Sequence, residues 1–303
     1  MTMPDRLKPA SVVRGWRDPP AAPRRVLLTG RDLDILKWLV HWRYGSTAQV
    51  LTVGDFPTPH AGHQRLNQLY QAGWVTSLRL RWPGPSTTAV WAITPSGLAA
   101  LADQEPQGGW DEVVSVVERA ANRHSIAHEL GRNAIVLAAE QHARAVGLDL
   151  VGIPDTDATI RAPIPGAASW LSITPDAVLD VRGQPWHLEY ERSWRRDTLT
   201  HKLHSFSLLL HHNLWRTRWL RAPKLLLVPE EAQSQGYRLE TWIHEVDAVR
   251  DAAVVVVPAA AIRDGTWTAW SWLESGDRDP TPRSWWDLAL RVDPIRGPVL
   301  PRR

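Results

Sequence analysis

The chain contains no cysteine, only two phenylalanines and two methionines, and few lysines. Without cysteine it forms no disulfides and offers no thiolate ligands, so a bound metal must be held by oxygen atoms or imidazole nitrogens. Its apolar runs are all shorter than the roughly 20 residues that a membrane-spanning helix requires. Residues 1–25 carry charges and prolines but no apolar segment typical of a signal peptide. These absences predict a cytoplasmic protein without a membrane partner.

Positive charge is unevenly distributed along the chain. Only four lysines accompany 31 arginines, a bias that indicates a GC-rich genome rather than nucleic-acid binding. Residues 1–110 hold 12 Lys and Arg against 7 Asp and Glu, whereas the remaining residues hold 23 against 25. The front part is therefore where we expect a polyanion to dock.

Tryptophan is unusually common, with 18 copies, several of them near the C-terminus. Most are expected to be packing residues, because large aromatic side chains contribute strongly to protein cores. The alternative is that some form a stacking surface for bases.

Residues 26–104 show the pattern of a winged helix-turn-helix, preceded by a flexible basic arm at 1–25. Thr29 with Asp32 predicts a helix start, and Pro59 suits a first helical turn. Hydrophobic periodicity and turn signals give the remaining elements. The predicted elements are helices at 29–41, 46–53 and 58–72, wing strands at 74–81 and 89–94, and a short helix at 94–101.

The third predicted helix has a polar outer face, because Leu66, Leu69 and Gly73 turn inward. In a winged helix this helix enters the major groove while the wing follows the DNA backbone. We therefore expect double-stranded DNA as a partner. The expected DNA-binding residues are His60, His63, Gln64, Arg65, Asn67 and Gln68 on the helix, with Arg79 and Arg81 on the wing. The alternative is a protein-interaction module whose polar face is only solvated.

A polar segment at 105–110 predicts a linker, followed by a second domain at 111–262 and a Trp-rich C-terminal extension at 263–303. The second domain begins with a helical pattern that contains His124 and His128; this pair could share a metal, or serve packing or surface roles. Short strands, a helix at 197–212, a strand at 224–228, a helix at 237–250 and a strand at 253–257 follow. This order predicts a mixed sheet flanked by helices, the layout of a restriction-endonuclease-like fold.

Two acidic positions lie thirteen residues apart within this domain. Asp176 precedes one apolar run and Glu189 lies in the next, with a turn at 182–185 between them. If both runs are neighbouring strands, the two carboxylates converge at one edge of a sheet. Two such oxygen ligands can hold Mg²⁺, which polarises a phosphate and lowers the pKa of a bound water. We therefore expect Asp176 and Glu189 to be metal ligands, with Mg²⁺ as the cofactor.

Several short motifs occur in a defined order along residues 27–260. They are LTGRDLDIL at 28–36, RLNQL at 65–69 with Gly73, TPSGL at 94–98, His124, PDA at 175–177, EYER at 189–192, and Lys202. In these motifs the chain resembles the replication-relaxation family of actinobacterial and plasmid-associated proteins, which combines a winged helix with a PD-(D/E)xK nuclease-like domain. The resemblance implies an α+β protein: an N-terminal winged helix-turn-helix followed by a restriction-endonuclease-like mixed-sheet α/β domain.

The resemblance also implies roles for individual residues. Asp176 and Glu189 would hold the metal, but Glu191 stands where the nuclease pattern has lysine, and a carboxylate cannot donate to the scissile phosphate. Lys202 on the following helix could reach back, and Glu129 on the preceding helix could be an additional ligand. The candidate catalytic residues are Asp176, Glu189, Glu191, Lys202 and Glu129. Alternatively, Glu191 pairs with a nearby arginine and Lys202 is a surface residue.

Two functions remain open at this point. In the first, a DNA-binding protein of plasmid or mobile-element replication or relaxation nicks DNA by Mg²⁺-dependent hydrolysis. In the second, it is a non-catalytic accessory protein or transcriptional regulator whose nuclease-like domain mediates dimerisation or contacts with replication or transfer proteins. A third alternative is a protein adaptor without any role on DNA.

Overall fold

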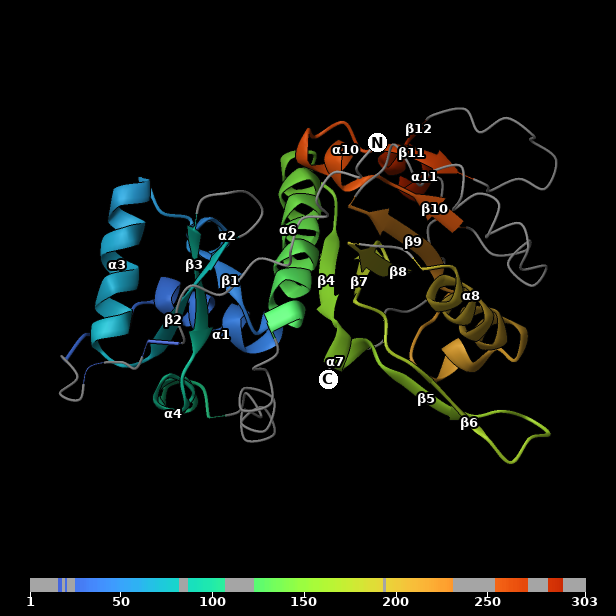
Figure 1. Ribbon diagram of the computed structural model, residues 1–303, viewed down its shortest axis with the longest axis horizontal. Helices are drawn as coiled ribbons and strands as arrows, with labels where there is room; N and C mark the ends of the chain where they lie inside the picture. Colours follow the sequence, from blue (N-terminus) through green and yellow to red (C-terminus); the bar gives the residue numbers. More distant parts are fainter. Residues whose placement is uncertain are drawn as a thin grey trace, which may run out of the picture. The chain divides into compact units, whose positions relative to one another are not determined.

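The computed structural model describes residues 16–17, 20, 25–81, 87–106, 123–192, 195–230, 254–271 and 283–290 (Figure 1). The chain divides into two compact units, residues 1–134 and 135–303. The predicted α+β class is confirmed, with a mainly helical unit before a unit built on a sheet. The boundary falls inside helix α6 (Arg123–Ala145), whereas the sequence predicts a linker at 105–110. None of the described helices is both long and apolar enough to span a bilayer.

In the part that the structure describes, the first unit contains four helices before α6, a short strand and a hairpin, and the helices and the hairpin follow the order that the sequence predicts for a winged helix. The elements are α1 (Gly30–Trp42), β1 (Gly45–Ser46), α2 (Thr47–Val53), α3 (Pro59–Gln71), β2 (Val75–Arg81), β3 (Thr87–Ile93) and α4 (Pro95–Gln104). The three strands form one antiparallel sheet in the order β1-β3-β2. The β2–β3 hairpin is thus extended by a third, very short strand.

Side-chain caps set the helix starts in this unit. Thr29 and Asp32 form the predicted capping box of α1, which satisfies two backbone donors at the exposed helix end. The hydroxyl of Thr58 caps α3 and Pro59 occupies its first turn. Leucines and isoleucines of α1, α3 and α4 then pack into one core with Val75 and Ile93 of the hairpin.

Two residues of the N-terminal segment contact the sheet of this unit. The N–H of Arg17 donates to the carbonyl of Ser77 at 2.8 Å, which adds a bridge to the edge of β2. The ring of Trp16 stacks on that of Tyr44, with 5.8 Å between their centroids. The segment predicted as a flexible arm therefore includes an ordered contact at residues 16–17.

The second unit is built on a seven-stranded mixed sheet in the order β12-β11-β10-β9-β8-β7-β4. Its strands are β4 (Leu150–Pro154), β7 (Ala177–Val181), β8 (Gln184–Glu191), β9 (Lys224–Pro229), β10 (Val254–Val256), β11 (Thr268–Ser271) and β12 (Arg283–Ser284). Strand β9 is parallel to both of its neighbours, and the remaining pairs are antiparallel. Because β11 and β12 belong to this sheet, the Trp-rich segment contributes to its fold.

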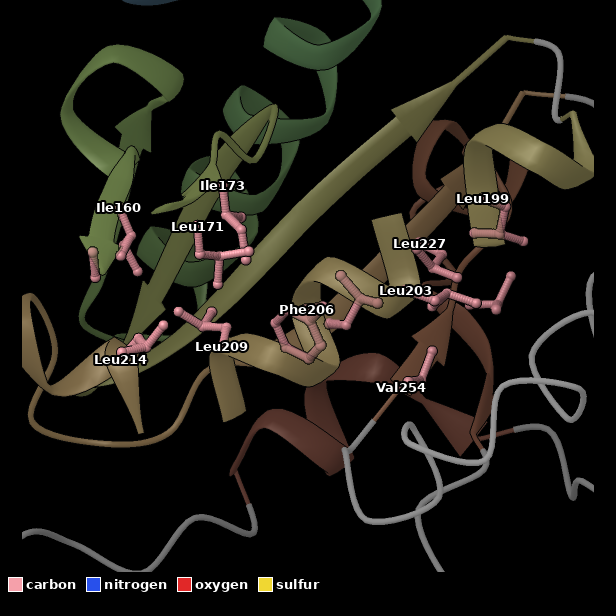
Figure 2. Packing of buried hydrophobic residues seen from close by; sticks show 13 residues of the cluster. Ile160, Leu171, Ile173, Leu199, Leu203, Phe206, Leu209, Leu214, Leu227 and Val254 are labelled. Carbon is pink, nitrogen blue, oxygen red and sulfur yellow. The ribbon is translucent and has the colours of Figure 1, made fainter. Parts of the chain in front are cut away.

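The described helices of this unit are the C-terminal part of α6, α7 (Asp155–Ala158), α8 (Arg196–His211), α10 (Ala259–Arg263), α11 (Trp285–Leu290) and the 3₁₀ turn η2 (Leu214–Thr217). Figure 2 shows how α8 covers one face of the sheet through Leu199, Leu203 and Phe206, which pack with Leu227 and Val254. On the opposite face, Trp186 of β8 meets Trp285 of α11. The helix predicted at 237–250 lies outside the described residues.

A separate two-stranded hairpin, β5 (Ile160–Pro163) and β6 (Trp170–Ile173), precedes β7. Its strands alternate between buried and exposed side chains. The buried face, made by Ile160, Ala162, Leu171 and Ile173, packs on the core beneath α8 (Figure 2). The sequence pattern predicts a strand at 158–162, close to β5, and a loop from there to residue 176, because proline, glycine and alanine dominate residues 163–168; β6 was therefore missed.

Candidate functional site

Asp176 and Glu189 face each other across two neighbouring antiparallel strands. Strand β7 pairs with β8 so that Ala177 lies opposite Leu188 and Val178 opposite His187. Continuing this register by one residue places Asp176 opposite Glu189, and residues directly opposite share a face of the sheet. The structure thus brings the two predicted acids together at the end of β8.

The backbone of β8 orients Asp176. The N–H of Tyr190 donates to Asp176 Oδ2 at 2.8 Å, and the N–H of Asp176 donates to the carbonyl of Leu188 at 3.0 Å. Charge-assisted hydrogen bonds of this kind are stronger than neutral ones. They hold the half-buried carboxylate of Asp176 beside Glu189.

Lys202 reaches back to the same strand from helix α8, as the resemblance implies. Its Nζ donates to Glu189 Oε2 at 2.5 Å and to Glu191 Oε1 at 3.0 Å. Leu199 and Leu203 anchor this face of α8 in the core, so the lysine is directed at β8. Side-chain exposure is 28% for Lys202, 9% for Glu189 and 21% for Glu191. We call Asp176, Glu189, Glu191 and Lys202 the acid–lysine cluster.

Burial shifts the protonation of this cluster. Burial raises the pKa of Glu189 to about 8, and the nearby Asp176 adds to the shift while Lys202 opposes it. Burial also disfavours the ammonium of Lys202, but attraction to Glu189 and Asp176 outweighs this and raises the pKa of Lys202. Lys202 therefore keeps its positive charge, whereas the raised pKa of Glu189 favours its protonated form at neutral pH. A bound cation would favour the ionised form of Glu189 instead.

The donor atoms of the cluster suit Mg²⁺. Carboxylate oxygens are the ligands this ion prefers, at about 2.1 Å, usually one or two of them with water completing the shell. Among the described residues no group of three or more His, Asp or Glu side chains is placed to hold a metal. Asp176 and Glu189 would therefore be the protein ligands, and the ion would compete with Lys202 for Glu189.

Glu129 has different partners from those that the resemblance implies. It lies on the part of α6 that belongs to the first unit, where Arg43 Nη1 is 2.7 Å from its Oε1 and Arg132 Nη2 is 2.5 Å from its Oε2. Asn133 adds hydrogen bonds to the carbonyls of Trp42 and Tyr44. These contacts attach the start of α6 to the end of α1 and engage both carboxylate oxygens of Glu129.

Helix α3 presents most of its predicted DNA-binding side chains to solvent. The exposed ones are His60, His63, Gln64, Asn67 and Gln68, and Arg79 is exposed on strand β2. The side chain of Arg81 lies outside the described residues, although its backbone belongs to β2. The polar face expected from the sequence is therefore present, apart from Arg65.

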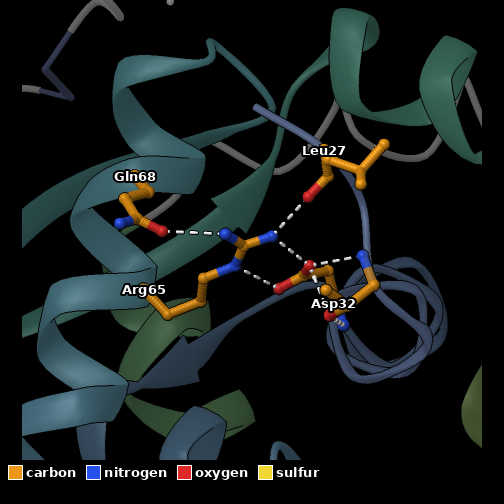
Figure 3. Close-up of polar contacts among 5 residues, drawn as sticks. Leu27, Asp32, Arg65 and Gln68 are labelled. Atoms are coloured by element: carbon orange, nitrogen blue, oxygen red, sulfur yellow. Dashed lines mark hydrogen bonds and ion pairs between the residues drawn. The ribbon is translucent and has the colours of Figure 1, made fainter. Parts of the chain in front are cut away.

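Arg65 is held inside the unit (Figure 3). Its Nε and Nη2 donate to the two carboxylate oxygens of Asp32 at 2.8 and 2.5 Å, and Nη2 and Nη1 also bond to Leu27 O and Gln68 Oε1. Burial would raise the pKa of Asp32, but the bonds from Arg65 and Thr29 hold it below its usual value. Arg65 therefore fixes α3 against α1, which leaves little of its guanidinium for a phosphate.

Two features at or near the acid–lysine cluster were not predicted from the sequence. The first is the Tyr190 backbone N–H that orients Asp176, because a main-chain donor has no sequence signal. The second is strand β6. Its alternation of Leu171 and Ile173 with exposed residues was a signal for a strand, but it covers only four residues.

Comparison with known proteins agrees with this arrangement. A family model described as replication-relaxation matches residues 36–219, which is more than half of the chain. The match begins within α1 and includes α3, the β2–β3 hairpin and the whole acid–lysine cluster. No curated protein and no solved structure shows significant similarity. The chain therefore belongs to the replication-relaxation family.

Proposed function

We propose that this protein binds double-stranded DNA through α3 and the β2–β3 wing, and nicks one strand by Mg²⁺-dependent hydrolysis at the acid–lysine cluster. Family membership suggests a role in the replication or relaxation of plasmid or mobile-element DNA. The observation that carries the catalytic part is the placement of Asp176 opposite Glu189, with Lys202 within hydrogen-bonding distance of Glu189. In this proposal the rear unit is a nuclease-like domain of the PD-(D/E)xK type.

The DNA-binding part is supported by the outer face of α3. Its exposed amide and imidazole side chains are able to donate to and accept from base edges, and a rigid helix improves such contacts because less order is lost on binding. The bidentate Arg65–Asp32 pair supplies that rigidity. Arg79 on the wing is placed to contact a phosphate.

A duplex-binding titration tests this part. The Gln64→Ala/Asn67→Ala double variant is expected to bind duplex DNA at least tenfold more weakly, because a bidentate base contact contributes about 1–3 kcal/mol. Gln104→Ala, which removes an exposed amide from α4, serves as the matched control and should bind normally. Equal binding by all three proteins would contradict a role for α3.

The chemistry expected at the cluster divides between its residues. Bound Mg²⁺ would polarise the scissile phosphate and lower the pKa of a water. Asp176 and Glu189 would hold the ion, and Asp176 stays oriented by the Tyr190 N–H. Once released from Glu189, the ammonium of Lys202 would donate to a phosphate oxygen and stabilise the charge that develops there.

Conversion of supercoiled plasmid to the nicked form tests the catalytic part. Wild type with Mg²⁺ should nick, and both Asp176→Ala and Glu189→Ala should abolish nicking while duplex binding is kept. Asp197→Ala is the control, because it removes an exposed carboxylate from the same helix as Lys202. Duplex binding without nicking by the wild type would leave only the second candidate function.

The second candidate is a non-catalytic DNA-binding accessory protein or regulator. The observation that favours it is the contact of Lys202 with both glutamates, which satisfies the buried carboxylates without any metal. In that case the cluster holds α8 on the sheet. Its substitution would lower stability but leave the DNA unmodified.

A further inference from the structure

The outer face of the β5–β6 hairpin carries an exposed tryptophan beside an arginine. Trp170 is 70% exposed and is the only aromatic among the strongly exposed large hydrophobic residues in the described part of the chain. It lies opposite Pro163 on the outer face, and Arg161 lies opposite Ser172 on the same face. Arg161 and Trp170 are therefore diagonal neighbours, within reach of one another.

This hairpin is firmly held on its inner side. Ile160, Leu171 and Ile173 pack against α8 and Leu214 of η2 (Figure 2). At the base, the hydroxyls of Thr159 and Thr174 lie 3.0 Å apart in a hydrogen bond. Arg218 also donates to the carbonyl of Asp157, just before the hairpin. The outer face is therefore presented on a supported element, although an isolated hairpin would be only marginally stable.

The hairpin leads directly into the acid–lysine cluster. Strand β6 ends at Ile173, three residues before Asp176. Six residues separate Trp170 from Asp176, so their Cα atoms are at most about 20 Å apart. A stacked nucleic-acid strand covers that distance in about six nucleotides, at ~3.4 Å each.

The charges near this face favour a polyanion. Arg161 is the only charged residue between Ile160 and Ile173. Exposed arginines also lie in and next to η2, namely Arg216 and Arg218, and Leu214 of η2 belongs to the core cluster that includes Ile160 of the hairpin. The acids nearest in sequence are Asp157 on α7, before the hairpin, and Asp176 of the acid–lysine cluster, after it. A single large aromatic ring among small exposed residues is less than the extended apolar patch that a protein partner would require.

We propose that the outer face of the β5–β6 hairpin binds an unpaired DNA strand next to the acid–lysine cluster, with a base stacked on Trp170 and its phosphate on Arg161. An exposed aromatic ring accepts any base, because every base has a flat face, and an arginine beside it neutralises the backbone. The proposal rests on the proposed function and specifies its substrate as DNA with a locally melted strand. Fully paired DNA cannot offer a base for stacking.

Binding to two matched DNA probes tests this inference. One probe is a full duplex and the other is the same duplex with a central unpaired bubble of about six nucleotides, the length that spans the hairpin to the cluster. Wild type should bind the bubble about tenfold more tightly than the duplex, as expected when one base stacks on an aromatic ring. Trp170→Ala and Arg161→Ala should lose this preference, whereas Trp170→Phe should keep most of it.

The full-length protein is used throughout. Binding to the duplex probe measures the contribution of α3 and the wing, whereas the preference for the bubble probe measures the contribution of the hairpin. Leu220→Ala, which removes another exposed apolar side chain, is the control and should behave as wild type. Unchanged duplex binding without any preference for the bubble in wild type would overturn this inference and leave the proposed DNA binding intact. Binding to neither probe would overturn both. Loss of self-association in Trp170→Ala with an unchanged bubble preference would show that the face contacts a second copy instead.

Discussion

Lys202 is the residue on which the state of the candidate site depends. Its ammonium compensates two glutamates in a region where Glu189 is only 9% exposed, and burying an unpaired carboxylate there would be costly. One of them, Glu189, is also a group that a metal would contact, together with Asp176. The site therefore has two ways of balancing its charge, an internal cation or an added one.

Replacing Lys202 by methionine separates these possibilities. Without Mg²⁺ at pH 9, where Glu189 is ionised, the variant should lose about 3 kcal/mol of unfolding free energy, because Glu189 and Glu191 lose the cation that they contact. Millimolar Mg²⁺ should restore part of this loss, since a ligand that binds only the folded state stabilises it. Chemical denaturation with and without Mg²⁺ measures both effects. The control is Lys37→Met, which removes an ion pair with Glu105 in the first unit; it should lose little stability and should not be stabilised by Mg²⁺. If Mg²⁺ does not stabilise Lys202→Met, the proposed metal site is contradicted.

His187 has a separate consequence for acid stability. It is buried on β8 against Phe206, and burial lowers the pKa of His187 to about 3. Between pH 6.5 and about 3 the unfolded chain therefore binds a proton that the folded chain does not, so stability falls as the pH falls through this window.

The unfolding free energy should fall by about 2 kcal/mol between pH 6.5 and pH 5, because one proton contributes about 1.4 kcal/mol per pH unit. His187→Leu should remove this contribution, whereas His211→Leu, at an exposed position of α8, should keep the wild-type dependence. Urea unfolding of the three proteins at both pH values is the measurement. Parallel pH curves for wild type and His187→Leu would show that another group controls acid unfolding.

At the scale of single elements, the ion pair of Arg65 with Asp32 attaches helix α3 to helix α1. Asp32 caps α1 and also receives two hydrogen bonds from Arg65, so one fully buried carboxylate connects two helices. Arg65→Ala should therefore cost about 3 kcal/mol, because it leaves that carboxylate without its charged partner. Lys37→Ala breaks a partly exposed pair and should cost at most about 1 kcal/mol.

Thermal unfolding and duplex binding at several salt concentrations measure the role of Arg65. Because its guanidinium is engaged by Asp32 and Gln68, the salt dependence of DNA affinity should stay the same in the folded variant. A shallower salt dependence with normal stability would instead identify Arg65 as a phosphate contact, as the sequence suggests.

Helix starts and hairpins were predicted correctly from the sequence where they depend on residues that are close together in the chain. The capping box of Thr29 and Asp32, the Pro59 start of α3 and the hairpin at 75–93 all depend on neighbours a few residues apart. The Arg65–Asp32 pair joins residues 33 positions apart, and no short pattern reports such a contact. Lys202 was anticipated from the resemblance, but its simultaneous contact with both glutamates depends on the packing of α8.

At the scale of the whole molecule, the tryptophans show why the C-terminal segment was difficult to interpret from sequence. Trp267, Trp285 and Trp286 are buried, and Trp285 also meets Trp186 from the centre of the sheet. His142 of α6 stacks on Trp286 at 4.5 Å. Composition predicted packing residues, but only the pairing of β10, β11 and β12 shows what they pack against.

Trp285→Ala is expected to destabilise the second unit by about 3–5 kcal/mol, the usual cost of removing a buried large aromatic side chain. Trp170→Ala removes the same side chain from an exposed position and should change stability by less than about 0.5 kcal/mol. Differential scanning calorimetry of both variants is the measurement. Similar unfolding temperatures for the two would mean that the aromatic cluster contributes little to the fold.

The order of strands in the large sheet has a consequence for biosynthesis. From β4 to β12, each described strand of this sheet lies beside the strand that precedes it in the chain. Nascent polypeptides fold from the N-terminal side while the ribosome still extends them. The sheet can thus grow outward one strand at a time, and both strands that carry the acids can pair before β10, β11 and β12 have been translated.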